Sequence, residues 1–374
     1  MPLTVNGITI PENVAGALMV NGVSITQIIA NGVQVWNQLL GPTMGLFFGG
    51  STGTSTYTNT VTRIDANGSQ VGSETAVGTA RYGAVGATVG SNGLFYGGYT
   101  GSYSNKVTRI DSNGSLVGSE TAIGTGRSSV AGATVGSNGL FFGGSTGTYT
   151  NAVTRIDANG SLVGSETAIG TARFGAGGAT VGSNGLFFGG FIGTFVVTNA
   201  ITRIDANGAL VGSETAIGTG RSYVAGATVG SNGLFYGGST STVNTNTNQV
   251  TRIDANGSQV GSETAVGTVR TGAGGATVGS NGLFFGGATS TSAYTNKVTR
   301  IDANGSLVGS ETAVGTVRGH AGGATVGSNG LFYGGSTSSF AVINAVTRID
   351  SNGSLVGSET AIGTARYAVA GASL

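Results

Sequence analysis

Residues 81–127 read RYGAVGATVGSNGLFYGGYTGSYSNKVTRIDSNGSLVGSETAIGTGR, and this unit recurs along the chain. Its block GLF[FY]GG returns every 46 to 49 residues, and each copy is followed by TRID, then NG, then VGSETA[VI]GT. A fixed period of about 50 residues, built from short apolar runs and glycine turns, is typical of a β-propeller. The block starts at Gly45, Gly93, Gly139, Gly185, Gly233, Gly282 and Gly330.

Each unit contains four strand-like segments. AVGATV (84–89) is small and apolar, LFYGG (94–98) is bulky, and KVTRID (106–111) alternates and is rich in β-branched residues. SLVGSETAI (115–123) supplies a fourth strand, and the SNG before it is typical of a two-residue hairpin turn. The sequence therefore predicts an all-β fold, a seven-bladed β-propeller of four-stranded antiparallel blades.

The repeat array is out of frame at its two ends. GPTM precedes the first GLFFGG, where other units carry ATVGSN, and residues 366–374 (RYAVAGASL) contain a first strand without its partners. We expect this C-terminal strand to complete the blade that opens near Gly45, which closes the ring and removes free sheet edges. The chain then divides into a small β-hairpin module (1–40) and the propeller (41–374).

The repeat resembles the kelch repeat. The resemblance rests on the apolar-aromatic pair and Gly-Gly doublet at 95–98, the aspartate that closes the third strand (Asp111) and the arginine that opens the next blade (Arg127). The tryptophan usual in the fourth strand of kelch repeats is replaced by Val and Ile, and the single tryptophan, Trp36, lies outside the repeats. The resemblance covers 41–374 and implies a propeller; a bacterial kelch-type protein-interaction module is one function that it implies.

Composition and charge argue against several classes of protein. The net charge of +1 gives no electrostatic basis for binding nucleic acid or an anionic membrane. No apolar run is long enough to insert into a bilayer, and the absence of cysteine excludes disulfides and thiolate metal sites. The first 20 residues have no basic region ahead of an apolar stretch, so we expect no cleaved signal peptide.

Nearly all charged residues are sevenfold features. One arginine lies in each TRID, a second precedes each first strand, and each SET carries a glutamate. A catalytic acid–base pair needs two different environments that separate the pKa values of its members, whereas identical blades supply identical environments, so we expect no enzyme and no cofactor. We expect these charges to pair within or between blades; the alternative is that the second arginines ring a channel mouth and bind an anionic ligand. The second arginines are Arg81, Arg127, Arg173, Arg221, Arg270, Arg318 and Arg366.

Metal and catalytic motifs are weak in this chain. His320 is the only histidine, and no cysteine or second histidine is present to join it as a metal ligand. The DANG turns share the start of a calcium-binding loop, but glycine stands at the fourth position and no glutamate follows at the twelfth. We expect hairpin turns there and no metal site.

The chemistry that differs between units lies in two loop positions. In a propeller, the 1–2 and 3–4 loops emerge on one face and the 2–3 and 4–1 loops on the other. The first pair reads GSNG and D[AS]NG with almost no variation, whereas the second pair varies and is rich in aromatic residues, Ser, Thr and Asn. Such surfaces suit adaptable recognition and also sugars; the alternative is loop drift without function. The candidate ligand-binding residues are Tyr82, Tyr103, Tyr149, Phe195, Tyr223, Tyr294, His320 and Phe340.

Residues 1–40 contain three Asn-Gly turns flanked by alternating apolar residues, which predicts successive hairpins. Hairpins this short are unstable alone, so we expect them to dock on another protein. VNGVSITQIIANGVQVW (20–36) is similar to N-terminal segments of tailed-bacteriophage virion proteins, especially tail-associated ones.

That similarity implies a non-enzymatic virion structural protein, tail-associated or fibre-like. Residues 1–40 would bind other virion proteins, and the propeller would contact a host-surface polysaccharide. A purely architectural or decorating role on the virion, and a carbohydrate-active enzyme built on a propeller, are the alternatives. The sequence also leaves a symmetric homo-oligomer open.

Overall fold

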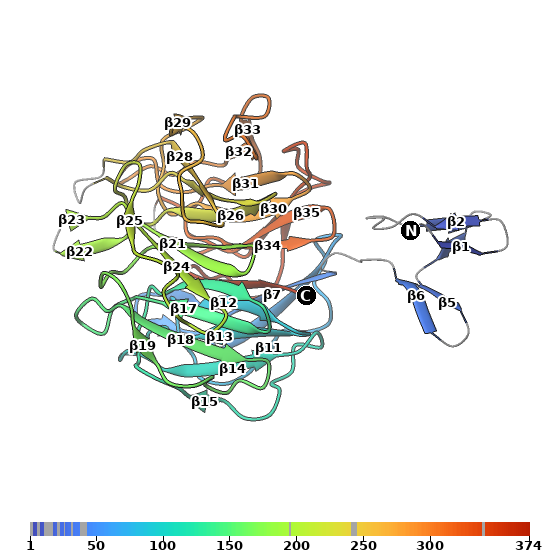
Figure 1. Cartoon of the computed structure of the whole chain (residues 1–374), viewed down its shortest axis with the longest axis horizontal. Helices are drawn as coiled ribbons and strands as arrows, with labels where there is room; N and C mark the ends of the chain where they lie inside the picture. The colour runs from blue at the N-terminus through green and yellow to red at the C-terminus, as the bar shows by residue number, and fades with distance from the viewer. Residues whose placement is uncertain are drawn as a thin grey trace.

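The structure is a computed structural model (Figure 1). It describes residues 43–193, 196–240, 245–338 and 341–374, and the backbone of six short strands before residue 38. All regular elements in these parts are β-strands, as predicted. Within them, no helix is long and apolar enough to cross a bilayer.

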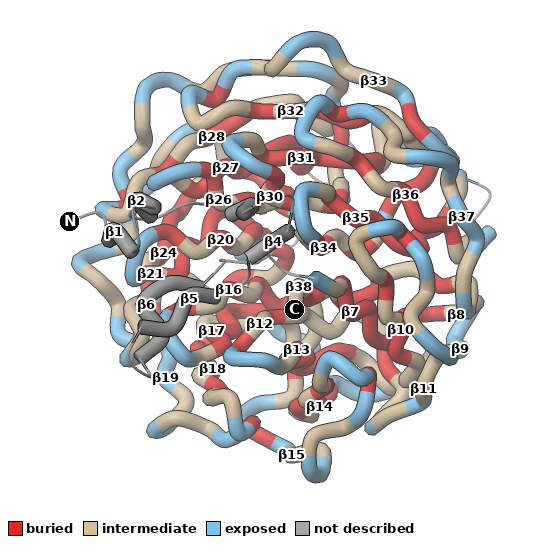
Figure 2. Tube along the Cα trace, turned by 90° about the vertical axis from the view of Figure 1, so that its right-hand side faces the viewer, coloured by how far each residue is buried: buried red, intermediate tan, exposed pale blue. Residues whose placement is uncertain are grey.

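Seven four-stranded antiparallel sheets stand around a central axis (Figure 2). We number the blades 1 to 7 by their second strands, which are β7 (Met44–Phe48), β13 (Asn92–Tyr96), β17 (Asn138–Phe142), β21 (Asn184–Phe188), β27 (Asn232–Tyr236), β31 (Asn281–Phe285) and β35 (Asn329–Tyr333). The innermost strands of blades 2 to 7, then of blade 1, are β12 (Val85–Val89), β16 (Ala131–Val135), β20 (Gly177–Val181), β26 (Ala225–Val229), β30 (Gly274–Val278), β34 (Gly322–Val326) and β38 (Ala370–Ser373).

The outer half of each blade is made by a third and a fourth strand. The third strands are β10 (Thr60–Asp65), β14 (Lys106–Ile110), β18 (Ala152–Asp157), β24 (Ala200–Asp205), β28 (Gln249–Asp254), β32 (Lys297–Asp302) and β36 (Ala345–Ile349). The fourth strands are β11 (Thr75–Ala76), β15 (Thr121–Ala122), β19 (Thr167–Ala168), β25 (Thr215–Ala216), β29 (Thr264–Ala265), β33 (Thr312–Ala313) and β37 (Thr360–Ala361). Short hairpins extend the 2–3 loops of blades 1 and 4: β8 (Ser51–Gly53) with β9 (Thr56–Tyr57), and β22 (Phe191–Gly193) with β23 (Val196–Val197).

The predicted closure of the ring is confirmed. Strand β38 pairs antiparallel with β7 and is the innermost strand of blade 1, with Ala370 opposite Phe48 and Ser373 opposite Gly45. Blade 1 therefore joins the last residues of the chain to the first repeat. Each inner strand lies beside another inner strand on both sides, so the blades that the structure describes form a closed ring.

The hydrophobic core lies between neighbouring blades. In blade 2, Leu94 and Tyr96 pack with Phe141 of blade 3, whereas Phe95 points the other way and packs with Phe48 of blade 1. The second strand is thus buried on both faces, which explains why it reads as a continuous apolar run and does not alternate.

Two local predictions were wrong. The 3–4 loop is a three-residue turn with a bulge, because Asp111 pairs with Ser115 and only Gly114 is left-handed (φ 75°). The fourth strand is also much shorter than 115–123, since the left-handed Gly118 (φ 70°) interrupts the ladder and leaves only Thr121–Ala122.

The three hairpins predicted before residue 40 are paired as expected. Strand β1 (Leu3–Val5) pairs with β2 (Ile8–Ile10), β3 (Leu18–Val20) with β4 (Val23–Ile25), and β5 (Gln27–Ala30) with β6 (Val33–Asn37). Their docking on another protein, and the division of the chain at residue 40, stay predictions.

Candidate functional site

A buried arginine joins each pair of neighbouring blades. Arg173 lies on the link from blade 3 to blade 4, is completely buried, and its Nη1 donates to Oε1 of Glu214 in blade 4 (2.7 Å). Its Nη2 donates to the hydroxyl of Thr202, and its guanidinium carbon lies 4.7 Å from the ring centre of Phe142 in blade 3. The same ion pair recurs at all seven junctions, with N–O distances of 2.5 to 3.5 Å. The pairs are Arg81–Glu120, Arg127–Glu166, Arg173–Glu214, Arg221–Glu263, Arg270–Glu311, Arg318–Glu359 and Arg366–Glu74.

The electrostatics keep both partners charged. Burial raises the pKa of the Glu214 carboxyl, but hydrogen bonds from Thr202 and Thr171 and the charge of Arg173 outweigh burial and set this pKa below its ordinary value. Burial lowers the pKa of Arg221 to about 10, which leaves it charged at neutral pH. These arginines are therefore structural, and the alternative in which they ring a channel mouth for an anionic ligand is wrong because their side chains are buried.

The arginine and aspartate of each TRID also serve the fold. Arg155 of blade 3 donates to the carbonyl of Ala206 in the 3–4 turn of blade 4 (3.4 Å), a contact that every repeat makes with its neighbour. Oδ1 of Asp157 accepts from the backbone N–H groups of Asn159 (2.9 Å) and Ser161 (2.8 Å), which shapes the 3–4 turn. The sevenfold charges are thus accounted for by structure.

The face formed by the 2–3 and 4–1 loops, here called the varied face, carries a row of three residues on each blade. The residue after the linking arginine pairs with the residue after the Gly-Gly doublet, which in turn pairs with a residue from the far arm of the 2–3 loop. The backbone frame is the same in every blade, but the side chains differ. From blade 1 to blade 7 the rows are Tyr367–Ser51–Tyr57, Tyr82–Tyr99–Tyr103, Ser128–Ser145–Tyr149, Phe174–Phe191–Val197, Ser222–Ser239–Asn246, Thr271–Ala288–Tyr294 and Gly319–Ser336–Val342.

Aromatic side chains connect these rows across blade junctions. An aromatic side chain at the outer end of one row contacts an aromatic side chain at the inner side of the next blade, so each contact joins two successive blades. The separations between ring centres are 4.9 Å for Tyr57–Tyr82, 4.8 Å for Tyr149–Phe174 and 6.3 Å for Tyr294–His320.

The structure places part of the predicted ligand-binding set in one cleft. Tyr82, Tyr294 and His320 come from blades 2, 6 and 7, and all three line a cleft of about 470 Å³ on the varied face. Phe195 and Phe340 lie outside the described residues. The aromatic and polar lining of the cleft comprises Ser51, Thr54, Ser55, Tyr57, Tyr82, Tyr294, His320, Ser336 and Tyr367.

The remaining predicted residues lie on the same face but outside this cleft. Tyr149 and Tyr223 both contact Phe174, with ring centres 4.8 and 6.0 Å away, and form a second aromatic cluster over blades 3 to 5. Tyr103 is 37% exposed and contacts Tyr99 edge-on. The eight residues are therefore not one site.

Sequence reasoning missed Tyr57 and Tyr367, which line the cleft. A signal for both was present, because Tyr57 occupies the same row position in blade 1 as Tyr103 in blade 2, and Tyr367 the same position as Tyr82. What the sequence could not show is which aromatic residues face each other across a junction.

A ring of left-handed residues forms the mouth of the central channel on the varied face. Tyr223 (φ 51°) and His320 (φ 57°) stand at a position that is glycine in three other blades. Left-handed backbone costs a residue with a Cβ about 1–2 kcal/mol. Each ring leans over the glycine of the preceding blade: Tyr223 over Gly175, and His320 over Gly272. These two side chains wall a shallow cup of about 300 Å³.

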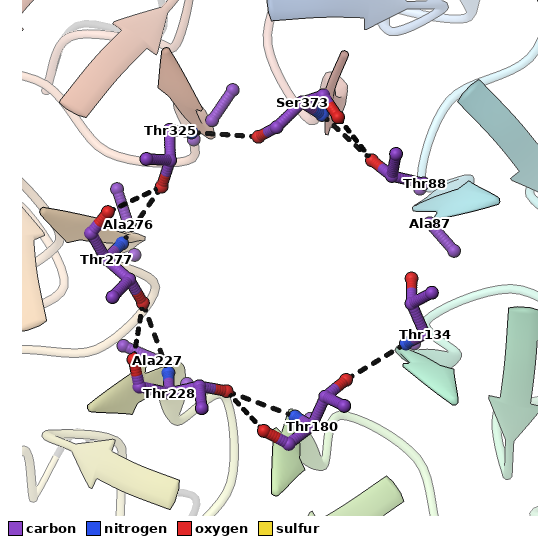
Figure 3. A pocket seen from close by; sticks show the side chains of 18 of the residues that line it. Ala87, Thr88, Thr134, Thr180, Ala227, Thr228, Ala276, Thr277, Thr325 and Ser373 are labelled. Carbon is purple, nitrogen blue, oxygen red and sulfur yellow. Dashed lines mark hydrogen bonds between the residues drawn. The ribbon is translucent and has the colours of Figure 1, made fainter. Parts of the chain in front are cut away.

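The channel itself is lined by hydroxyl groups that are used by the fold (Figure 3). The Oγ1 of Thr277 accepts from the backbone N–H of Thr228 (3.2 Å) and donates to its carbonyl (2.9 Å). Hydrogen bonds of this kind link neighbouring inner strands around the ring. Figure 3 shows the one junction without such a hydrogen bond, between Thr88 and Thr134. The channel has a volume of about 240 Å³, and its hydroxyls bridge every junction except that between β12 and β16, so they serve the structure of the ring.

In the part of the chain that the structure describes, no group of three or more His, Cys, Asp or Glu side chains is placed to hold a metal ion. No protein-family model matches the chain, and the search of curated proteins gave no match. The interpretation of the varied face therefore depends on its own geometry and chemistry.

Proposed function

We propose that this chain is a non-enzymatic structural protein of a tailed-bacteriophage virion, tail-associated or fibre-like, and that its propeller binds a host-surface polysaccharide. The observation that carries the proposal is that the repeated residues and the varied residues have different roles. The repeated charges lock the blades, whereas the residues that differ between blades form aromatic and hydroxyl rows on one face only.

The chemistry of the varied face supports a sugar ligand. Sugars present an apolar C–H face that packs on aromatic rings and a rim of hydroxyl groups that hydrogen-bond to Tyr, Ser and His side chains. A concave site with aromatic walls and few polar groups is the usual form of a small-ligand pocket, and the cleft of about 470 Å³ falls within the usual size range.

Two features of the repeat and the N-terminus support the rest of the proposal. In each blade the Gly-Gly doublet is left-handed, and a Cβ on Gly97 would lie 2.5 Å from the carbonyl oxygen of Arg127, which supports a kelch-type repeat. The paired hairpins β1–β6 and the similarity of residues 20–36 to virion proteins support attachment to a virion through residues 1–40.

The test is binding of the full chain to an array of bacterial surface polysaccharides. We expect the variant with Tyr103→Ala, Tyr149→Ala and Tyr294→Ala to bind at least about thirtyfold more weakly, because truncating an anchor aromatic costs about 2 kcal/mol or more. The matched control carries Asn67→Ala, Asn113→Ala and Asn159→Ala on the opposite face and should bind like the wild type.

Two outcomes would count against the proposal. Loss of binding in the asparagine control alone would show that the opposite face is the binding face. A wild-type chain that binds no polysaccharide would favour a decorating role, in which the propeller packs against other virion subunits; electron microscopy of intact particles would then show which subunits it contacts.

A further inference from the structure

We propose that the cleft where the ring closes, between blades 1, 2, 6 and 7, is a subsite for one or two uncharged sugar residues. This inference rests on the function proposed above and names the site and the ligand class. The cleft is separate from the second aromatic cluster around Phe174, so the two can be tested independently.

Aromatic pairs wall the cleft from two directions. Tyr57 and Tyr82 are 4.9 Å apart between ring centres and approach it from blades 1 and 2, whereas Tyr294 and His320 approach it from blades 6 and 7. Tyr367 of blade 1 contributes a third wall. This arrangement offers ring faces to the C–H surface of a pyranose from more than one side.

The polar groups of the cleft suit a neutral ligand. Among the described residues that line it, none is Arg, Lys, Asp or Glu. The His320 side chain is solvent-exposed at the edge of the cleft, but desolvation by the residues packed around it lowers the pKa of its imidazole. The imidazole is therefore neutral at neutral pH and can both donate and accept a hydrogen bond. The hydroxyls of Tyr57, Tyr294 and Tyr367 make no hydrogen bond with any residue of the described ranges and are free to bind ligand hydroxyls.

The backbone at His320 is strained. It holds a left-handed conformation (φ 57°) at a position that is glycine in blades 2, 4 and 6 and is Ser129, Tyr223 or Ala368 in the other blades, and Ser55, which also lines the cleft, is left-handed too (φ 58°). Strain of this kind persists where the surrounding structure enforces it, and it clusters at ligand sites. At His320 it places the only imidazole of the chain at the edge of the cleft.

The absence of charged groups argues against acidic sugars. A sialic or uronic acid would bring a carboxylate next to tyrosine hydroxyls with no arginine or lysine to balance it, and the nearby arginines of the blade junctions are already paired. Binding should therefore depend little on salt, in contrast to a site that relies on exposed charges.

The experiment compares two substitutions at equivalent backbone positions in the full chain. His320→Gly removes the imidazole from the cleft, whereas Ser129→Gly removes a side chain from the same left-handed position on another side of the mouth. Both place glycine where glycine is the favoured residue, so both proteins should fold, which thermal unfolding checks. Tyr57→Ala is a second cleft variant.

The probes are methyl glycosides of glucose, galactose, mannose, rhamnose and N-acetylglucosamine, with glucuronic and N-acetylneuraminic acid as the charged set. We expect at least one neutral glycoside to bind, with binding at least tenfold weaker in His320→Gly and Tyr57→Ala and unchanged in Ser129→Gly. Affinity should change less than twofold between 0.05 and 0.5 M NaCl.

The outcomes separate this inference from the proposed function. If the cleft variants His320→Gly and Tyr57→Ala bind the glycosides like the wild type, the chain binds sugar elsewhere on the varied face and this inference is wrong. If only the acidic sugars bind, the ligand class is wrong. If neither these probes nor the polysaccharide array binds the wild-type chain, both the subsite and the proposed function fall.

Discussion

A single side chain, the arginine that precedes each inner strand, holds two blades at once. In the junction before blade 4, Arg173 stacks on Phe142 of blade 3 and hydrogen-bonds to Glu214 and Thr202 of blade 4. Its Nε has no partner among the described residues, so the stacked ring and the carboxylate are its main compensation for burial. The same residue recurs at all seven junctions, so each pair of neighbouring blades is joined by one buried arginine paired with a glutamate.

Removing the carboxylate should be costly even where the shape is kept. In Glu214→Gln the guanidinium of Arg173 stays completely buried without an anion, and loss of one partner from a buried ion pair costs about 3–5 kcal/mol. We expect the free energy of unfolding in urea to fall by about 3 kcal/mol. The control is Lys106→Gln, which lies outside the seven arginine–glutamate pairs (the locks) and should change the free energy of unfolding by less than about 0.5 kcal/mol. Equal stability of the two variants would show that the buried ion pair is dispensable.

At the scale of the strand, the fit between inner strands sets how tightly the ring closes. A Cβ on Gly178 would lie 2.3 Å from the carbonyl oxygen of Gly132, and similar approaches occur at most junctions. Between β12 and β16 the approach is looser: a Cβ on Gly132 would lie 3.2 Å from the carbonyl oxygen of Gly86. Val85 lies at this junction, where the other inner strands have Ala or Gly.

Val85→Ala should therefore tighten the junction between blades 2 and 3. The methyl group of Val85 stands 2.8 Å from the position of a Cβ on Gly132, so its removal lets β12 and β16 approach. We expect Thr134 Oγ1 to accept from the N–H of Thr88, as at the other junctions, and hydrogen exchange in residues 85–89 to slow. The matched variant Ala131→Gly, at the same position of blade 3, should not slow it, and unchanged exchange in Val85→Ala would rule out this role for Val85.

The elements that the sequence predicted best are those with a strong period. The repeat gave the number of blades, three strands of each, and the C-terminal closure, because these follow from spacing and apolar runs. The sequence pattern overestimated the length of the fourth strand, because Gly118 can be either extended or left-handed and nothing in the local sequence decides which. It misjudged the 3–4 turn because Asn-Gly also occurs in three-residue turns, where Asp111 fixes the geometry through its carboxylate.

At the scale of the whole molecule, each of the seven blades contributes one row of three residues to the varied face, and the seven rows differ in their side chains. The sequence predicted which loops would share that face, since propeller topology fixes it. It could not predict that Tyr57 contacts Tyr82 or that Tyr294 contacts His320, because both contacts cross blade junctions and the second involves the left-handed backbone of His320. The cleft at ring closure thus joins residues from both ends of the repeat array.

The sevenfold lock also predicts how the whole propeller responds to acid. The pKa of each lock glutamate is lowered in the folded protein: burial raises it, but hydrogen bonds from threonine and the paired arginine outweigh burial. The unfolded chain, with pKa values near 4.5, binds more protons than the folded chain as the pH falls below that value. The stability from the locks is therefore complete above about pH 5 and is lost as the pH falls through the lowered pKa values.

Because seven glutamates titrate together, the loss should be steep. One carboxylate can change the free energy of unfolding by at most about 1.4 kcal/mol per pH unit, so urea unfolding between pH 5 and pH 2.5 should show a slope several times larger. Glu214→Gln removes one of the seven sites and should reduce that slope while leaving the plateau between pH 5.5 and 7 flat. A wild-type slope no larger than that of a single carboxylate would mean that the glutamates are not held by the lock in solution, and that the ring is stabilised by its apolar junctions alone.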